Sequence, residues 1–125
     1  MNYQFCIIQW CDDICQDEAV NIGLIMEDLN SKELFFKFIE NFDRLVCFFQ
    51  HPFNKEFMLD YFESIKDSMK WRQETLKTFS ELIEVEKEIW FPSFKFTSIG
   101  SGIKGNRDTF EKLFKRFVLH EKSSS

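Results

Sequence analysis

The order of hydrophobic patterns along the chain is the feature that most restricts its fold. Three short segments, residues 3–10, 20–27 and 33–39, alternate or concentrate apolar side chains as β-strands do. From residue 54 onwards, apolar side chains instead recur at intervals of three and four, as in amphipathic helices. Strands that come first and helices that follow are the order of α+β folds. The sequence therefore predicts an α+β fold, a mostly antiparallel sheet of three to five strands with helices packed on it.

The last helix has the clearest pattern and is expected over about residues 108–120. Asp108 and Glu111 have the spacing of a capping box, so we expect this helix to begin at Asp108. A second strong helical pattern covers residues 54–70. The apolar stripe that would pack the last helix on the sheet comprises Phe110, Leu113, Phe114, Phe117 and Val118.

The remaining segments complete the expected fold. Residues 73–83 have a further helical pattern, and residues 94–99 alternate like a late strand at an edge of the sheet. Residues 42–49 favour a short helix, with a strand as the alternative. The glycines within residues 100–105 indicate a flexible loop before the last helix.

The length and composition are those of one domain. A chain of 125 residues is too short for two ordinary domains. Its hydrophobic content of 44% excludes a largely disordered chain, and its 17 phenylalanines supply enough apolar area for a substantial core. We expect a single domain over residues 1–122 and a disordered serine tail at 123–125.

The net charge of −5 argues against two classes of partner. Non-specific nucleic-acid binding needs a basic surface that neutralises phosphates, and an anionic membrane surface would repel this chain. No segment approaches the roughly 20 apolar residues of a membrane span, and the first residues lack the basic and small residues of a signal peptide. The expected location is the cytoplasm.

Residues that could carry catalysis or hold a metal are scattered. Cys11 and Cys15 lack the second ligand pair that structural zinc sites usually have. Cys47 and His51 have the spacing of neighbours on a helix, but Pro52 follows directly and ends that helix. We therefore expect no enzyme activity, no metal, no cofactor and no disulfide.

The second predicted strand carries the candidate binding residues. Asn21 and Gly23 are expected on one face, where a small polar side chain lies beside a position with no side chain. Such a surface suits close docking of a partner or ligand, and internal packing over Gly23 is the alternative. Glu18 precedes this strand in an acidic loop. A ligand site would combine Glu18 and Asn21 with residues 100–105.

The two ends of the chain resemble a known bacterial family. Tyr-Gln-Phe-Cys-Ile-Ile at residues 3–8, Glu-Ala-Val-Asn-Ile-Gly-Leu-Ile at 18–25 and the closing helix at 108–118 are similar to the family called domain of unknown function 3037. The resemblance implies a small prokaryotic or phage protein that is often encoded beside a HipA-like serine/threonine kinase.

These observations lead to one preferred function and one alternative. The preferred function is a non-enzymatic protein-binding module, either an accessory or antitoxin-like partner of a HipA-like kinase or a phage-type inhibitor. The alternative is a small-molecule or nucleotide-binding module. An exposed Trp71 or Trp90 would mark a protein interface, because tryptophan is enriched in binding hot spots.

Overall fold

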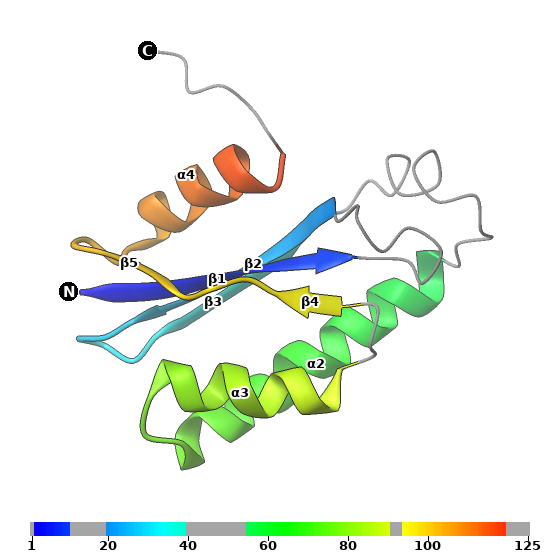
Figure 1. Cartoon of the computed structure of the whole chain (residues 1–125), viewed down its shortest axis with the longest axis horizontal. Helices are drawn as coiled ribbons and strands as arrows, with labels where there is room; N and C mark the ends of the chain where they lie inside the picture. Colours follow the sequence, from blue (N-terminus) through cyan, green and yellow to red (C-terminus); the bar gives the residue numbers. More distant parts are fainter. Residues whose placement is uncertain (1, 11–19, 40–54, 91–93, 120–125) are drawn as a thin grey trace.

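A computed structural model describes residues 2–10, 20–39, 55–90 and 94–119, and it shows a five-stranded antiparallel sheet with helices on both faces (Figure 1). The strands are β1 (Tyr3–Trp10), β2 (Val20–Asp28), β3 (Leu34–Phe38), β4 (Phe94–Phe96) and β5 (Gly100–Gly102). The helices are α2 (Lys55–Thr75), α3 (Phe79–Ile89) and α4 (Arg107–Phe117). The predicted α+β class, with a single domain, is confirmed.

The sheet has a continuous strand at one edge and a broken strand at the other. The strand order is β3-β2-β1-β4, and β5 also pairs with β1. β4 pairs with the end of β1 near Trp10, and β5 pairs with the end near Tyr3. Between them, Thr97 continues the contact, because its backbone amide donates to the Ile7 carbonyl at 3.0 Å. β1 therefore lies inside the sheet, between β2 and the broken strand.

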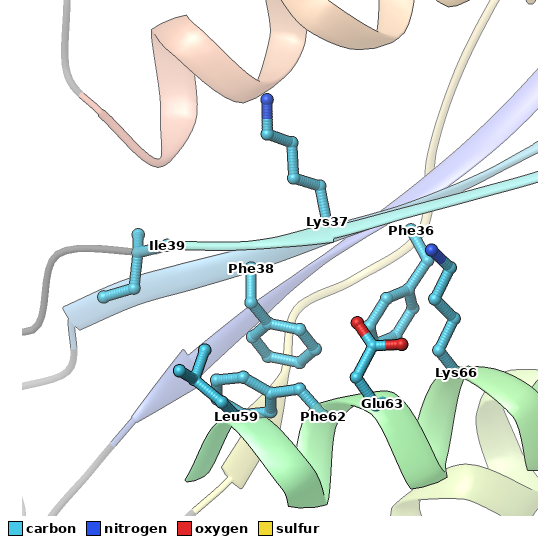
Figure 2. A pocket seen from close by; sticks show the side chains of 8 residues that line it. All are labelled: Phe36, Lys37, Phe38, Ile39, Leu59, Phe62, Glu63 and Lys66. Carbon is cyan, nitrogen blue, oxygen red and sulfur yellow. The ribbon is translucent and has the colours of Figure 1, made fainter. Parts of the chain in front are cut away.

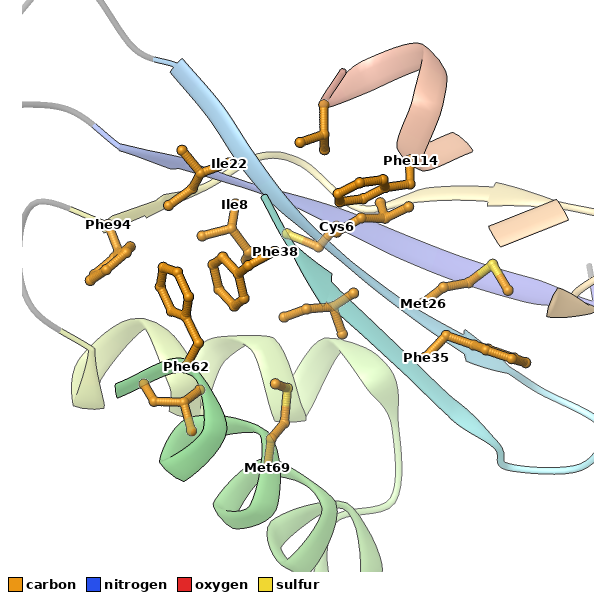
Figure 3. Packing of buried hydrophobic residues seen from close by; sticks show 14 of the residues in the cluster. Cys6, Ile8, Ile22, Met26, Phe35, Phe38, Phe62, Met69, Phe94 and Phe114 are labelled. Carbon is orange, nitrogen blue, oxygen red and sulfur yellow. The ribbon is translucent and has the colours of Figure 1, made fainter. Parts of the chain in front are cut away.

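The helices divide between the two faces of the sheet. α2 and α3 lie on one face and α4 on the other (Figure 1). On the α2 face, the rings of Phe38 and Phe62 stack with centroids 3.6 Å apart. On the α4 face, Phe35 stacks on Phe110 with centroids 5.5 Å apart. Figure 3 shows Phe35, Phe38 and Phe62 around the strands, and the buried aromatic rings build the core on both sides of the sheet.

A buried ion pair joins α2 to α3. Arg72 donates two hydrogen bonds of 2.8 Å to the carboxylate of Glu86, one from Nε and one from a terminal nitrogen. The indole nitrogen of Trp90 donates a third, of 2.7 Å, to the same carboxylate. Glu86 has no exposed surface, so these three donors replace the water that the carboxylate loses on burial.

Several helix boundaries differ from the prediction. α2 continues to Thr75, and the next helix begins only at Phe79, because Thr78 caps it by accepting the Glu81 amide at 3.1 Å. The prediction that Asp108 caps α4 is wrong. Asn106 is the cap and accepts the Thr109 amide at 2.9 Å.

The glycine-rich segment also differs from the prediction. Gly100 and Gly102 belong to strand β5, where a flexible loop was expected. A side chain at Gly100 would overlap the ring of Phe5, and one at Gly102 would overlap Tyr3. The glycines therefore let the aromatic rings of β1 lie directly against the edge strand.

Several predictions fall on residues that the structure leaves undescribed. These include the element at 42–49, the tail at 123–125, the Cys47–His51 pair, and Cys11 with Cys15. Among the described helices, none is both long enough and apolar enough to cross a membrane.

Candidate functional site

The candidate residues on β2 lie on opposite faces of the sheet. The pairing of β1 with β2 changes register between Ile8 and Gln9, where Ile8 pairs with Gly23 and Gln9 pairs with Asn21. This β-bulge leaves Ile22 as an additional residue on β2. The side chains before the bulge therefore point to the opposite face from the one that regular alternation predicts. The prediction that Asn21 and Gly23 share a face is therefore wrong. Glu18 lies outside the described residues.

Asn21 is held on the α4 face by two hydrogen bonds. Its Nδ2 donates to the carbonyl of Phe117, the last residue of α4, at 2.8 Å. Its Oδ1 accepts from the side chain of Gln9 at 2.8 Å. The final carbonyls of a helix have no partner within the helix, so Asn21 satisfies one of them.

The space beside Gly23, on the α2 face of the sheet, is occupied by a side chain of the protein itself. A Cβ at this position would lie 2.8 Å from Cδ1 of Phe38, which is too close for a methyl group. The ring of Phe38 in turn stacks on Phe62 of α2. This arrangement matches the alternative of internal packing over Gly23.

The residues expected to form a ligand site are also apart. Asn21 pairs with Gln9 near one end of β1, whereas Gly100 and Gly102 pair with Phe5 and Tyr3 near the other end. Among the described glycines none has a positive φ angle, and the Gly100–Gly102 segment is an edge strand. The described part of the chain therefore does not gather Asn21 and the glycines into one cradle.

The structure draws attention instead to the outer edge of β3. Within the described residues β3 pairs only with β2, so its other side carries peptide groups that point away from the sheet. The Ile39 amide donates to the Ile22 carbonyl, and Asp28 donates to the carbonyl of Glu33. Because the bonded positions alternate along an antiparallel strand, the peptide groups of Leu34, Phe36 and Phe38 face outward.

Two helices form walls on either side of this edge. A hollow of about 220 Å³ lies between β3 and α2. Figure 2 shows Phe36 and Phe38 pointing into it, toward Phe62 and Leu59 of α2, while Lys37 points to the opposite side of the strand. Glu63 and Lys66 of α2 complete the rim. This end of the edge is mainly aromatic and aliphatic.

A second hollow, of about 210 Å³, extends across the edge of β3 from α2 to α4. Lys66 and Lys70 reach it from α2, and Arg107 and Glu111 reach it from α4. We call the outer edge of β3 together with both hollows the β3 edge groove. Its residues are Leu34–Phe38 on β3, Ile39 just beyond it, Leu59, Phe62, Glu63, Lys66 and Lys70 on α2, and Arg107, Phe110 and Glu111 on α4.

The charges in the β3 edge groove are mostly positive. Glu111 is paired already, with Lys37 at 3.2 Å and with Arg107 at 3.9 Å. Lys66 and Lys70 have no ion-pair partner in the part of the chain that the structure describes. Two cations without an ion pair therefore lie one helical turn apart on α2, beside the outer edge that β3 presents in the described chain, and Glu63 lies near Lys66 in the first hollow.

Two features of the sequence could have indicated this groove. Residues 34–38 read Leu-Phe-Phe-Lys-Phe, an apolar strand with one cation at its fourth position. Lys66 and Lys70 are spaced to share one face of a helix. What the sequence cannot specify is that β3 lies at an edge, because strand order follows from long-range pairing.

Of the other candidate side chains, Cys6 and Trp90 are explained by packing, whereas Trp71 is not. Burial raises the pKa of the Cys6 thiol to about 11, so this cysteine is a neutral thiol at physiological pH. Trp90 is buried and bonded to Glu86, whereas Trp71 is 66% exposed on α2. In the described ranges, no three residues among His, Cys, Asp and Glu come together as metal ligands would.

Comparison with known proteins gives no match: no family model, no curated protein and no solved structure matches this chain.

Proposed function

We propose that this chain is a cytoplasmic, non-enzymatic module that binds another protein by accepting an extended segment along the outer edge of β3. The observation that carries the proposal is the outward-facing peptide groups of β3, set between the walls of α2 and α4. In this mode of recognition, the main-chain hydrogen bonds of the added strand contribute affinity and side-chain hollows contribute specificity.

The size of the hollows favours a peptide over a small molecule. Their volumes of about 220 and 210 Å³ lie below the roughly 300–1,000 Å³ of typical ligand pockets. Each is large enough for one side chain of an added strand. The alternative of a small-molecule or nucleotide-binding module has no comparable support among the described residues.

The opposite edge of the sheet is a poorer docking strand. β4 and β5 have three residues each and are separated by Thr97, Ser98 and Ile99. β3 has five consecutive residues. A short, interrupted edge offers few successive hydrogen bonds to an incoming strand, so β3 is the edge that supports binding.

The resemblance of the chain ends supplies a first candidate partner. A HipA-like serine/threonine kinase is the partner that this resemblance implies, with the module as an accessory, antitoxin-like or phage-type inhibitory protein. The structural argument concerns the binding mode and applies to any protein with an exposed extended segment.

The test exploits the direction of the Leu34 peptide group. Leu34→Pro removes one outward N–H without removing a hydrogen bond to β2, whereas Leu34→Ala keeps that N–H and removes a similar amount of side chain. Wild type and both variants are used for affinity purification from the native host, and co-purifying proteins are quantified by mass spectrometry.

We expect at least one protein to co-purify with wild type and Leu34→Ala in similar amounts and to be lost with Leu34→Pro. Far-ultraviolet circular dichroism establishes that both variants are folded. A partner retained equally by Leu34→Pro would exclude the edge as the binding site. A nucleotide or metabolite at stoichiometric occupancy, with no protein partner, would support the alternative module.

A further inference from the structure

We propose that the segment bound along β3 is acidic, with one apolar side chain preceding its acidic residues at alternate positions. This inference rests on the proposed function and specifies the chemistry of the partner. Its basis is the distribution of apolar and cationic side chains along the two walls of the β3 edge groove.

The cations of the groove are distinctive because the whole chain carries a net charge of −5. Four cations and one carboxylate line the second hollow, and that carboxylate, Glu111, is already shared by Lys37 and Arg107. Lys66 and Lys70 form no ion pair among the described residues, and Glu63 of the first hollow is the other carboxylate of the groove. Complementary charge at a binding surface favours the partner of opposite sign and raises its association rate.

The groove also has a direction. Leu59 and Phe62, earlier in α2, line the hollow with Phe38 at the end of β3. Lys70, later in α2, lines the hollow with Leu34 at the start of β3. α2 therefore runs antiparallel to β3 along the groove, with an apolar end and a cationic end.

This direction predicts the order of residues in the bound segment. Side chains of an added strand alternate between the faces, so positions opposite Phe38, Phe36 and Leu34 all point toward α2. An antiparallel segment would place an apolar side chain opposite Phe38 first. Acidic side chains two and four positions later would then lie near Lys66 and Lys70.

The same charges disfavour a second copy of this chain as the occupant. A symmetric antiparallel pairing of two β3 strands centred on Phe36 would keep both α2 helices on the same face of the joined sheet. Lys66 of each copy would then lie near the pairing axis, cation against cation. Like charges held close together repel each other, so the groove favours an acidic partner over a second copy of this chain.

The experiment selects peptides without assuming a partner. A displayed library of random nine-residue peptides is selected against three full-length proteins: wild type, Lys66→Glu/Lys70→Glu, and Lys95→Glu/Lys115→Glu. The third protein is a matched control, because it has the same change in net charge at lysines outside the groove, on β4 and α4. Enriched peptides are synthesised and their dissociation constants measured by calorimetry.

We expect wild type and the matched control to enrich peptides with acidic residues at alternate positions after an apolar one. The strongest should bind Lys66→Glu/Lys70→Glu at least about ten-fold more weakly, since attraction is replaced by repulsion at two positions. Replacing the acidic residues of the peptide by lysine should restore binding to Lys66→Glu/Lys70→Glu. Raising the salt concentration should weaken the wild-type interaction.

The outcomes separate this inference from the proposed function. Enriched peptides that lose affinity on Leu34→Pro but have no acidic preference would overturn the acidic partner and leave edge binding standing. Failure to enrich any peptide would overturn both. Equal weakening by Lys66→Glu/Lys70→Glu and by the matched control would show a general effect of net charge and would overturn the assignment to the groove. A dimer in light scattering that Leu34→Pro dissociates would identify the occupant as a second copy.

Discussion

The guanidinium of Arg72 on α2 holds the fully buried carboxylate of Glu86 on α3 through two hydrogen bonds of 2.8 Å. Trp90 completes the arrangement with a bond of 2.7 Å to the same carboxylate. Because α2 forms one wall of the β3 edge groove, this buried pair helps to fix the position of that wall.

Removing one partner of this pair should strongly destabilise the fold. Arg72→Met would leave a buried carboxylate with only Trp90 as a donor, and we expect the free energy of unfolding to fall by about 3–5 kcal/mol. Arg72→Met/Glu86→Leu should recover most of this loss because no buried charge remains. Urea unfolding measures both. As a control, Lys112→Met, which breaks an exposed pair with Asp108, should cost less than about 1 kcal/mol. If Arg72→Met also lowered the free energy of unfolding by less than about 1 kcal/mol, the stabilising role assigned to the Arg72–Glu86 pair would be contradicted.

Alkaline pH should destabilise the protein through Cys6. Burial raises the pKa of this thiol from 9.0 to about 11, so between these values the unfolded chain loses a proton that the folded chain keeps. Stability should therefore fall as pH rises from 9 to 11, by about 2–3 kcal/mol in total. Unfolding curves of wild type and Cys6→Ala measured across this range give the difference due to Cys6. A constant difference would show that Cys6 does not titrate in this way.

Asn21→Asp tests the hydrogen bond from β2 to the end of α4. The substitution keeps an oxygen for Gln9 but replaces the Nδ2 donor with an acceptor that faces the Phe117 carbonyl. We expect a loss of about 1–3 kcal/mol at neutral pH. Below about pH 4 the gap to wild type should narrow, because a protonated carboxyl group is again a donor. Gln9→Ala, which leaves the bond to Phe117 intact, is the comparison and should cost less.

A methyl group at Gly23 should compete with the ring of Phe38 for the same space. Gly23→Ala would place a Cβ 2.8 Å from that ring, and overpacking of this kind costs about 1–3 kcal/mol. In the background of Phe38→Leu, which removes the ring, the same substitution should cost clearly less. A double-mutant cycle in chemical denaturation measures the coupling. Additive effects would mean that Phe38 is not what requires glycine here.

The sequence predicted the elements of this fold better than their relationships. Short, largely apolar runs identified β1 and β2, because each strand lies inside the sheet and is covered on both faces. It could not predict the bulge between Ile8 and Gln9, which depends on pairing with another strand. This single change of register separates Asn21 from Gly23, and the expected shared face disappears.

Local competition between neighbours explains the errors at helix ends. Asp108 and Asn106 are both good capping residues. Asn106 is the cap in the structure, so α4 begins at Arg107. Asp108 then lies inside the helix and pairs with Lys112. The β3 edge groove was missed for a different reason. Its parts come from β3, α2 and α4, and only the packed fold brings Lys66 and Arg107 to the same hollow.

The unequal edges of the sheet limit how many strands this protein can accept from partners. Only β3 presents an uninterrupted row of outward peptide groups in the described chain, since β4 and β5 divide the opposite edge into two short pieces. A molecule with one such edge can be joined by one strand and cannot link two partners through its sheet. By strand addition it would act as an end group and not as a repeating unit, so its complexes should stay discrete instead of growing into fibres.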